Sequence, residues 1–178
     1  MSAHEIEAST KKTVPVHLRV WKDVYDSLEE EARTQRTSLN ALANQVLATH
    51  TRDEKVLREV GFMRLTKASF RCGLGLMPDD KLSEWGMTAA KGVQNTVMMA
   101  RDGAITLDAV LDDLRLLSRS GWFSMDETKH DGRANICFMH DFGPRWSVVH
   151  AAYVAGLFGR IGVRPKITTT DSSVMVEY

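Results

Sequence analysis

The sequence has little cysteine and no long apolar run, and each shortage excludes a class of protein. Its 178 residues include two cysteines, Cys72 and Cys137, which are too few and too far apart for a disulfide framework or a C-x-x-C motif. The longest strongly apolar run, AAYVAGLFG, has about half the roughly 20 residues that a bilayer span needs. The N-terminal MSAHEIEASTKK is polar and unlike a signal peptide. We therefore expect a cytoplasmic protein with no membrane segment.

An excess of one charge is also lacking. Lys and Arg balance Asp and Glu at 23 each, so any basic surface for nucleic acid must be local. The chain has no Gly-rich phosphate loop, no nucleophile elbow and no paired carboxylates at a telling spacing. Cys137 and His140 are three residues apart on an expected strand, so they should point to opposite faces and not share an ion. The sequence thus predicts no enzyme activity, no cofactor and no metal.

The most informative stretch near the N-terminus is TVPVHLRVWKDVYDSL, residues 13–28. The spacing of its apolar residues changes halfway along. Val14, Val16, Leu18 and Val20 are apolar at every second position, which predicts a half-buried strand. From Lys22 onward the apolar residues recur at every fourth position, which predicts a helix. No second strand lies nearby, and a lone strand leaves its backbone N–H and C=O groups unpaired.

The chain divides into a flexible tail (1–12), a small module (13–52) and a larger domain (53–178). The module has the strand, a helix over about 22–35 and a second helix from Ser38 to about residue 51, with Ser38 as its N-cap. The polar segment THTRDEK is the expected junction, and FMRL is expected as a short strand or a helix end. About 40 residues cannot build a core alone, but two copies can. We expect the strands of two chains to pair antiparallel around a shared core of Val16, Leu18, Val20, Leu42 and Val46.

The sequence of the larger domain predicts an α+β fold with a small antiparallel sheet. Helices are expected at about 66–76, 79–101, 106–119 and 144–161, after the capping residues Thr66, Asp79 or Asp80, and Thr106. GWFSMDETKHDGRANICFMH predicts a hairpin turning at Asp131-Gly132, and PKITTT and SVMVEY predict two closing strands. Small residues recur at Ala151, Ala155 and Gly159, which predicts internal packing or a second oligomer contact.

The N-terminal module resembles the ribbon-helix-helix family of DNA-binding proteins, which includes the Arc and MetJ repressors. The resemblance covers about residues 13–51 and depends on HLR in the strand, SLN at the start of the second helix and the spacing between them. It implies that the paired strands enter the major groove of double-stranded DNA. The matching base-contacting positions are Thr13, Pro15, His17 and Arg19.

Within this resemblance, Arg19 suits guanine, since its fork of donors matches two acceptors on that base. Pro15 departs from the family's pattern because it offers no polar group, so specificity could depend partly on DNA shape. The start of the second helix would bind phosphate through its free N–H groups. Further phosphate contacts are expected from Lys11, Lys12, Lys22, Arg36, Ser38 and Asn40.

The segment CFMHDFGPRWSVVH is the most unusual part of the larger domain. His140 and Asp141 end a strand, and Trp146 and His150 lie one helical turn apart on one face. These four residues are a candidate ligand pocket. The alternative is that His140 or Asp141 caps the next helix and Trp146 packs in the core. The closing part of the chain has a slighter resemblance to small-molecule-binding domains of the vinyl-reductase type.

The sequence therefore predicts a homodimeric, DNA-binding transcriptional regulator, a repressor associated with the nucleoid. Its C-terminal domain would sense a small-molecule effector or build higher oligomers. One alternative is an antitoxin-like protein whose C-terminal domain binds a protein partner. Another is a low-specificity protein that coats DNA.

Overall fold

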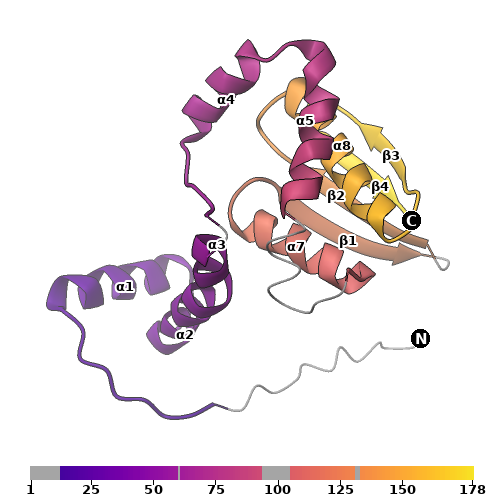
Figure 1. Cartoon of the computed structure of the whole chain (residues 1–178). Coiled ribbons are helices and arrows are strands. Elements are labelled where there is room, and N and C mark those ends of the chain that lie inside the picture. Colours follow the sequence, from indigo (N-terminus) through magenta and orange to yellow (C-terminus); the bar gives the residue numbers. More distant parts are fainter. Residues whose placement is uncertain (1–12, 60, 94–104, 131–132) are drawn as a thin grey trace. The chain divides into compact units, whose positions relative to one another are not determined.

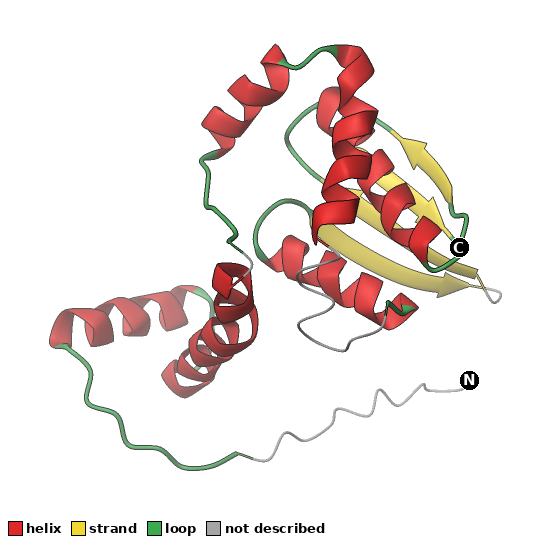
Figure 2. Ribbon diagram, viewed as in Figure 1, coloured by secondary structure: helices red, strands yellow, loops and turns green. Residues whose placement is uncertain are grey.

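The computed structural model describes residues 13–59, 61–93, 105–130 and 133–178. It has the predicted α+β composition, with helices along the chain and one four-stranded antiparallel sheet near the C-terminus (Figures 1 and 2). The chain divides into two units, Met1–Ala48 and Thr49–Tyr178. The expected tail with Lys11 and Lys12, the hairpin turn at 131–132 and the last part of the helix predicted over 79–101 lie outside the described residues.

The N-terminal unit is built on helices α1 (Lys22–Thr34) and α2 (Leu39–Thr49), close to their predicted bounds. Ala32 of α1 and Leu42 of α2 are buried. Ser38 caps α2 as predicted, because its Oγ accepts a hydrogen bond from the N–H of Ala41 at 3.1 Å. The sequence thus places both helix starts correctly.

The strand predicted over Val14–Val20 does not form in the single chain. Residues 13–21 are a loop that leads into α1 (Figure 2). Val14, Val16, Leu18 and Val20 are 74%, 69%, 64% and 50% exposed. A strand needs a neighbouring edge for its backbone groups, and the described residues of this unit contain no other strand.

Helical backbone continues past α2 through the predicted junction. A π-helical turn, η1 (His50–Glu54), is followed directly by α3 (Lys55–Glu59). Thr49 and Lys55, which flank η1, both have right-handed helical dihedrals. Residues 62–65, the FMRL segment, are a loop and belong to neither a strand nor a helix.

The C-terminal unit continues with α4 (Lys67–Leu76), α5 (Asp79–Val93), α7 (Leu107–Arg119) and α8 (Pro144–Arg160). Thr66 caps α4 and Thr106 caps α7, each by accepting an N–H hydrogen bond three residues on at 3.2 Å. These two caps and the helix starts agree with the sequence prediction. The predicted cap at Asp79 or Asp80 is wrong, because both residues lie in the first turn of α5.

The sheet consists of β1 (Ser124–His130), β2 (Arg133–Met139), β3 (Lys166–Thr169) and β4 (Ser173–Glu177) in the order β1-β2-β4-β3. Both predicted hairpins are present and antiparallel. One face of the sheet supplies Ile136, Phe138, Val174 and Val176 to the main core, where they meet buried residues of α7 and α8. The other face carries the row Asp126, Cys137, Met175 and Thr168.

Helices α5 and α8 approach each other through small residues, but not through the predicted stripe. Ala155 and Gly159 are exposed. The close contact uses the neighbouring stripe instead: a Cβ at Gly86 of α5 would lie 2.2 Å from the backbone oxygen of Val149, and one at Gly156 of α8 would lie 2.7 Å from Cβ of Ala90. Period alone does not say which of two adjacent helix faces packs inward, and both faces here are rich in small residues.

Candidate nucleic-acid interface and ligand cavities

The predicted base-contacting residues Thr13, Pro15, His17 and Arg19 are all exposed and share the loop before α1. Among the predicted phosphate contacts, Lys22 forms an ion pair with Asp26 at 2.8 Å, one turn along α1. The other described contacts, Arg36, Ser38 and Asn40, lie together and exposed around the start of α2. The structure therefore gathers the three residues expected at the helix N-terminus, and leaves the loop residues free to contact a partner.

Arg36 has a backbone conformation that favours glycine. Its φ is 55°, in the left-handed region. The turn is a Schellman motif, in which the N–H of Thr37 donates to the oxygen of Ala32 at 2.9 Å and the N–H of Arg36 donates to the oxygen of Arg33 at 3.2 Å. A non-glycine residue at this position costs roughly 1–2 kcal/mol. The chain therefore holds a cation in a strained turn, two residues before Ser38, the N-cap of α2.

Of the predicted dimer core, Leu42 is buried within the single chain and the other members are not. Val16, Leu18 and Val20 are exposed as described above, and Val46 of α2 is 47% exposed. The same unit also exposes Trp21 and Leu47. Large apolar side chains therefore remain uncovered along the loop and on α2, which is the pattern that a second copy would cover.

His140 of the second candidate site is held by a short chain of hydrogen bonds. The Oγ of Ser147 lies 2.9 Å from Nε2 of His140 and donates to the backbone oxygen of Thr170 at 2.6 Å. Because a serine hydroxyl has one proton, it must accept from His140, which fixes the proton of this imidazole on Nε2. Burial lowers the pKa of His140. The residue is a neutral structural donor that ties β2 to α8.

Asp141 pairs with residues of α4. It is exposed and accepts from Nζ of Lys67 at 3.1 Å, with Arg71 also at 3.1 Å. The hydrogen bond from Lys67 is the main cause of the lowered pKa of Asp141. Neither His140 nor Asp141 caps α8, whose N-cap is Gly143 with φ 85°. The predicted cap is therefore wrong, and Asp141 belongs to a surface ion-pair cluster with α4.

Trp146 and His150 do come together as predicted. Their rings are stacked with centroids 5.8 Å apart, and His150 also stacks on Phe123 at 4.5 Å. His150 is 1% exposed. Burial, with a smaller effect from His140, lowers the pKa of His150 to about 3, so its imidazole is neutral at physiological pH.

These rings line an apolar cavity of about 160 Å³, which we call the inner cavity. Nε1 of Trp146 and both ring nitrogens of His150 are buried, and they have no hydrogen-bond partner among the described residues. Tyr153, which also lines the cavity, donates its hydroxyl proton to Asp113 at 2.8 Å. The remaining walls are apolar and come from Phe62, Phe70, Trp85, Ala89, Leu117, Trp122, Phe123 and Val149.

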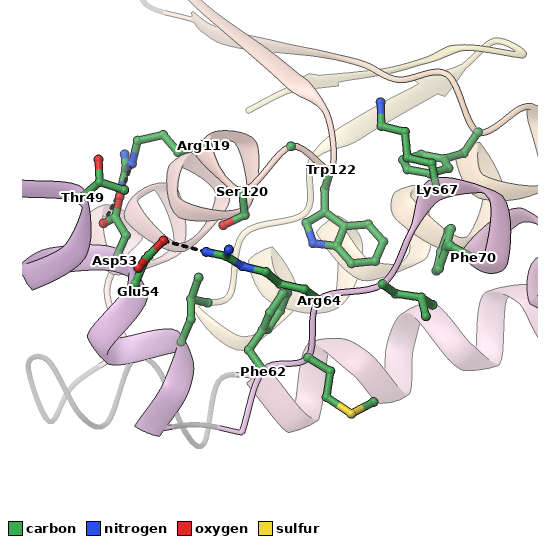
Figure 3. Close-up of a pocket in the computed structure, with 15 residues that line it drawn as sticks. Thr49, Asp53, Glu54, Phe62, Arg64, Lys67, Phe70, Arg119, Ser120 and Trp122 are labelled. Carbon is green, nitrogen blue, oxygen red and sulfur yellow. Dashed lines mark hydrogen bonds and ion pairs between the residues drawn. The ribbon is translucent and has the colours of Figure 1, made fainter. Parts of the chain in front are cut away.

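A larger cavity of about 430 Å³, the outer cavity, shares Phe62, Phe70 and Trp122 with the inner one. Figure 3 shows two ion pairs at one end of the outer cavity. Arg119 donates two hydrogen bonds to Asp53, at 2.8 and 3.1 Å, and Arg64 donates to Glu54 at 2.6 Å. Hydrogen bonds from His50 and Arg64 lower the pKa of Glu54. The two ion pairs balance their own charges, and the rest of the wall combines aromatic rings with aliphatic side chains and Lys67.

No sequence pattern pointed to the residues that hold these cavities in place. Phe70 of α4 lies 4.9 Å from Trp122, 5.1 Å from Trp146 and 5.1 Å from Phe142, measured between ring centroids. Arg145 donates to the backbone oxygens of Leu74 and Met77 and pairs with Asp79, which fixes the turn between α4 and α5 on the start of α8. Phe70 lies in the helix predicted over about 66–76, but no sequence pattern indicated its aromatic neighbours, which come from distant segments.

Within the described part of the chain, no three His, Cys, Asp or Glu side chains are grouped as a metal site would require. None of the helices described is both long and apolar enough to span a bilayer. Comparisons with protein-family models, with curated proteins and with solved structures found no match to this chain.

Proposed function

We propose that the chain is a sequence-specific DNA-binding transcriptional regulator, a repressor that acts as a homodimer. In this account residues 13–20 of two chains pair as an antiparallel ribbon that enters the major groove. The C-terminal unit serves as the effector-sensing or oligomerisation domain. The observation that carries the proposal is the exposure of Val16, Leu18 and Val20 at alternate positions beside two helices of suitable length.

Two further features of the N-terminal unit support the proposal. Alternation gives such a ribbon a second, polar face, on which His17 and Arg19 would lie. Arg36, a cation on a strained backbone, precedes a helix N-terminus whose N–H groups and dipole favour a phosphate. Strain of this kind usually persists where a function requires the side chain.

Sedimentation of the full chain and of Leu18→Asp tests the dimer. Leu18 would lie in the shared core, so a charge there should leave a monomer, with DNA affinity lost. Leu65→Asp is the matched control, because Leu65 is 60% exposed in the C-terminal unit, against 64% for Leu18. A Leu18→Asp protein that remains dimeric and binds DNA would exclude the ribbon. A DNA-binding dimer that only Leu65→Asp disrupts would place the interface in the other unit.

A further inference from the structure

The outer cavity has the size and the walls of a small-molecule site. Its volume of about 430 Å³ lies within the roughly 300–1,000 Å³ typical of such sites, whose walls are mostly apolar with a few polar groups. Its lining residues all belong to the C-terminal unit, and Phe62, Phe70, Trp122 and Phe142 supply aromatic rings. Phe70 and Phe142 are buried, and Trp122 stacks on Trp146 with centroids 5.5 Å apart. This wall is therefore formed before any ligand binds.

One end of the cavity offers hydrogen-bond donors that the chain itself does not use. One terminal nitrogen of Arg64 donates to Glu54, and its remaining N–H groups have no partner among the described residues. The same holds for the indole N–H of Trp122, which is accessible and lies on the side of the ring that faces Arg64 (Figure 3). Both carboxylate oxygens of Asp53 and of Glu54 already lie within hydrogen-bond distance of a side-chain nitrogen. A ligand that displaces water here must therefore supply acceptors.

The charges around the cavity favour an uncharged ligand. Each of the three cations in the wall has a carboxylate partner: Arg64 pairs with Glu54, Lys67 with Asp141 and Arg119 with Asp53. The wall therefore has no unpaired cation that would compensate an ionised ligand for its lost hydration. A carbonyl oxygen accepts two hydrogen bonds and carries no charge, so it suits the unused donors.

We infer that the outer cavity binds an uncharged aromatic molecule with one carbonyl group, whose oxygen accepts hydrogen bonds from Trp122 and Arg64. The volume is nearly three times the roughly 150 Å³ of a cavity that takes up benzene, so two fused rings fit. The aromatic walls would pack against the faces and edges of those rings.

The position of the cavity along the chain deepens the proposed function. Part of its wall comes from residues 49–57, which lie on the helical backbone that continues α2 through η1 and α3. A π-helical turn such as η1 is often found at a functional site. A ligand in the cavity would thus contact the helical segment that follows the DNA-binding module. That the ligand is an effector of DNA binding rests on the proposed function, whereas binding itself does not.

Equilibrium dialysis of the full chain, without DNA, tests the inference with 2-acetylnaphthalene, 2-ethylnaphthalene and 2-naphthoate. The first has the carbonyl group, the second has a similar size without an acceptor, and the third is charged. We expect saturable binding of the two neutral probes and no binding of 2-naphthoate. A chain that binds DNA but no probe would contradict this inference alone. A chain that takes up 2-acetylnaphthalene but binds no DNA would contradict the proposed function alone.

Variants of the wall locate the site. Trp122→Phe keeps an aromatic ring and removes the indole N–H. It should weaken binding of 2-acetylnaphthalene roughly tenfold, which corresponds to one net hydrogen bond, and leave binding of 2-ethylnaphthalene nearly unchanged. Leu57→Trp fills the cavity and should abolish binding of both neutral probes. Leu76→Trp is the matched control, because Leu76 is 81% exposed and lies outside the cavity wall, so it should change neither affinity.

The inference is overturned if 2-acetylnaphthalene does not bind or if 2-naphthoate binds at least as tightly. Equal losses of both neutral probes in Trp122→Phe would show that the indole contributes only its ring, which contradicts the hydrogen bond to the carbonyl group. Full affinity in Leu57→Trp would place the ligand outside the cavity.

Discussion

The indole of Trp146 and the imidazole of His150, one turn apart on α8, are stacked with their planes 12° apart. Phe123 covers the imidazole at 22°, and the ring of Phe138 meets it edge-on at 4.8 Å. The imidazole is therefore enclosed by aromatic rings and kept uncharged by burial. This arrangement makes the stability of the protein depend on pH.

We expect the protein to lose stability as the pH falls from 6.5 toward 3. The folded state keeps His150 neutral down to about pH 3, whereas the unfolded chain takes up a proton below about pH 6.5. Lowering the pH from 7.5 to 5 should therefore reduce the free energy of unfolding by about 2 kcal/mol. Urea denaturation at both pH values measures it.

His150→Phe should remove the part of the pH dependence of stability that comes from His150. The lowered pKa of His140 acts in the same direction and would remain, while Tyr153 does not titrate in this range. Equal pH dependence in the wild type and in His150→Phe would show that His150 is protonated in the folded state.

Gly86→Ala should destabilise the C-terminal unit by about 1–3 kcal/mol. The added Cβ would overlap the backbone oxygen of Val149, and backbone atoms cannot move aside cheaply. Thermal melting measures the loss. Gly159→Ala is the control on α8: its Cβ would meet no atom within 4 Å among the described residues, so it should raise stability by up to about 1 kcal/mol. Equal effects of the two substitutions would contradict the close packing of α5 on α8.

Much of this fold follows from local patterns in the sequence. The caps at Ser38, Thr66 and Thr106 and the period of the apolar residues gave helix starts within one residue, because both signals act over a single turn. The turn signal at Asp131-Gly132 and the strand-like runs beside it gave β1 and β2, because a hairpin turn is also a local signal. The missing strand before α1 shows the limit, since a strand depends on an edge that one chain does not supply.

The candidate sites were less predictable. Trp146 and His150 could be paired because they lie on one helix, at a spacing that fixes their relation. Phe62, Phe70, Trp85 and Trp122 reach the same cavity from separate segments, and no local pattern encodes which of them meet. His140 was expected in that pocket. Its N–H donor is instead satisfied by the hydroxyl of Ser147, so His140 links the end of β2 to α8.

Arg36→Gly should stabilise the N-terminal unit and weaken DNA binding. Glycine adopts φ 55° without strain, and after its greater freedom in the unfolded chain is subtracted the gain is roughly 0.5–1 kcal/mol. Loss of one phosphate contact should lower affinity equally on all sequences and reduce the salt slope by about 1. Fluorescence anisotropy at several salt concentrations measures both.

Arg36→Gln is the matched control for this position. It removes the charge but keeps a side chain in the left-handed turn, so affinity should fall without a gain in stability. If Arg36→Gly stabilises the protein and leaves DNA affinity unchanged, Arg36 makes no phosphate contact.

Arg19→Ala should weaken the free energy of binding to the preferred DNA site by about 1–3 kcal/mol. It should also relax specificity at one base pair, because Arg19 would contact a guanine edge. Lys22→Ala is the comparison, since a phosphate contact should weaken all sequences alike. Affinities for the preferred duplex and for single-base variants distinguish the two. A uniform loss with Arg19→Ala would make it a phosphate contact.

Selection of bound fragments from a pool of random duplex DNA, with the full chain at near-physiological salt, tests the central claim most directly. A dimeric ribbon that reads bases should recover a short repeated half-site whose spacing reflects the pairing of two chains. Binding without a motif, fading as salt rises, would contradict sequence-specific regulation and indicate a protein that coats DNA. No binding at all would contradict the DNA-binding account altogether.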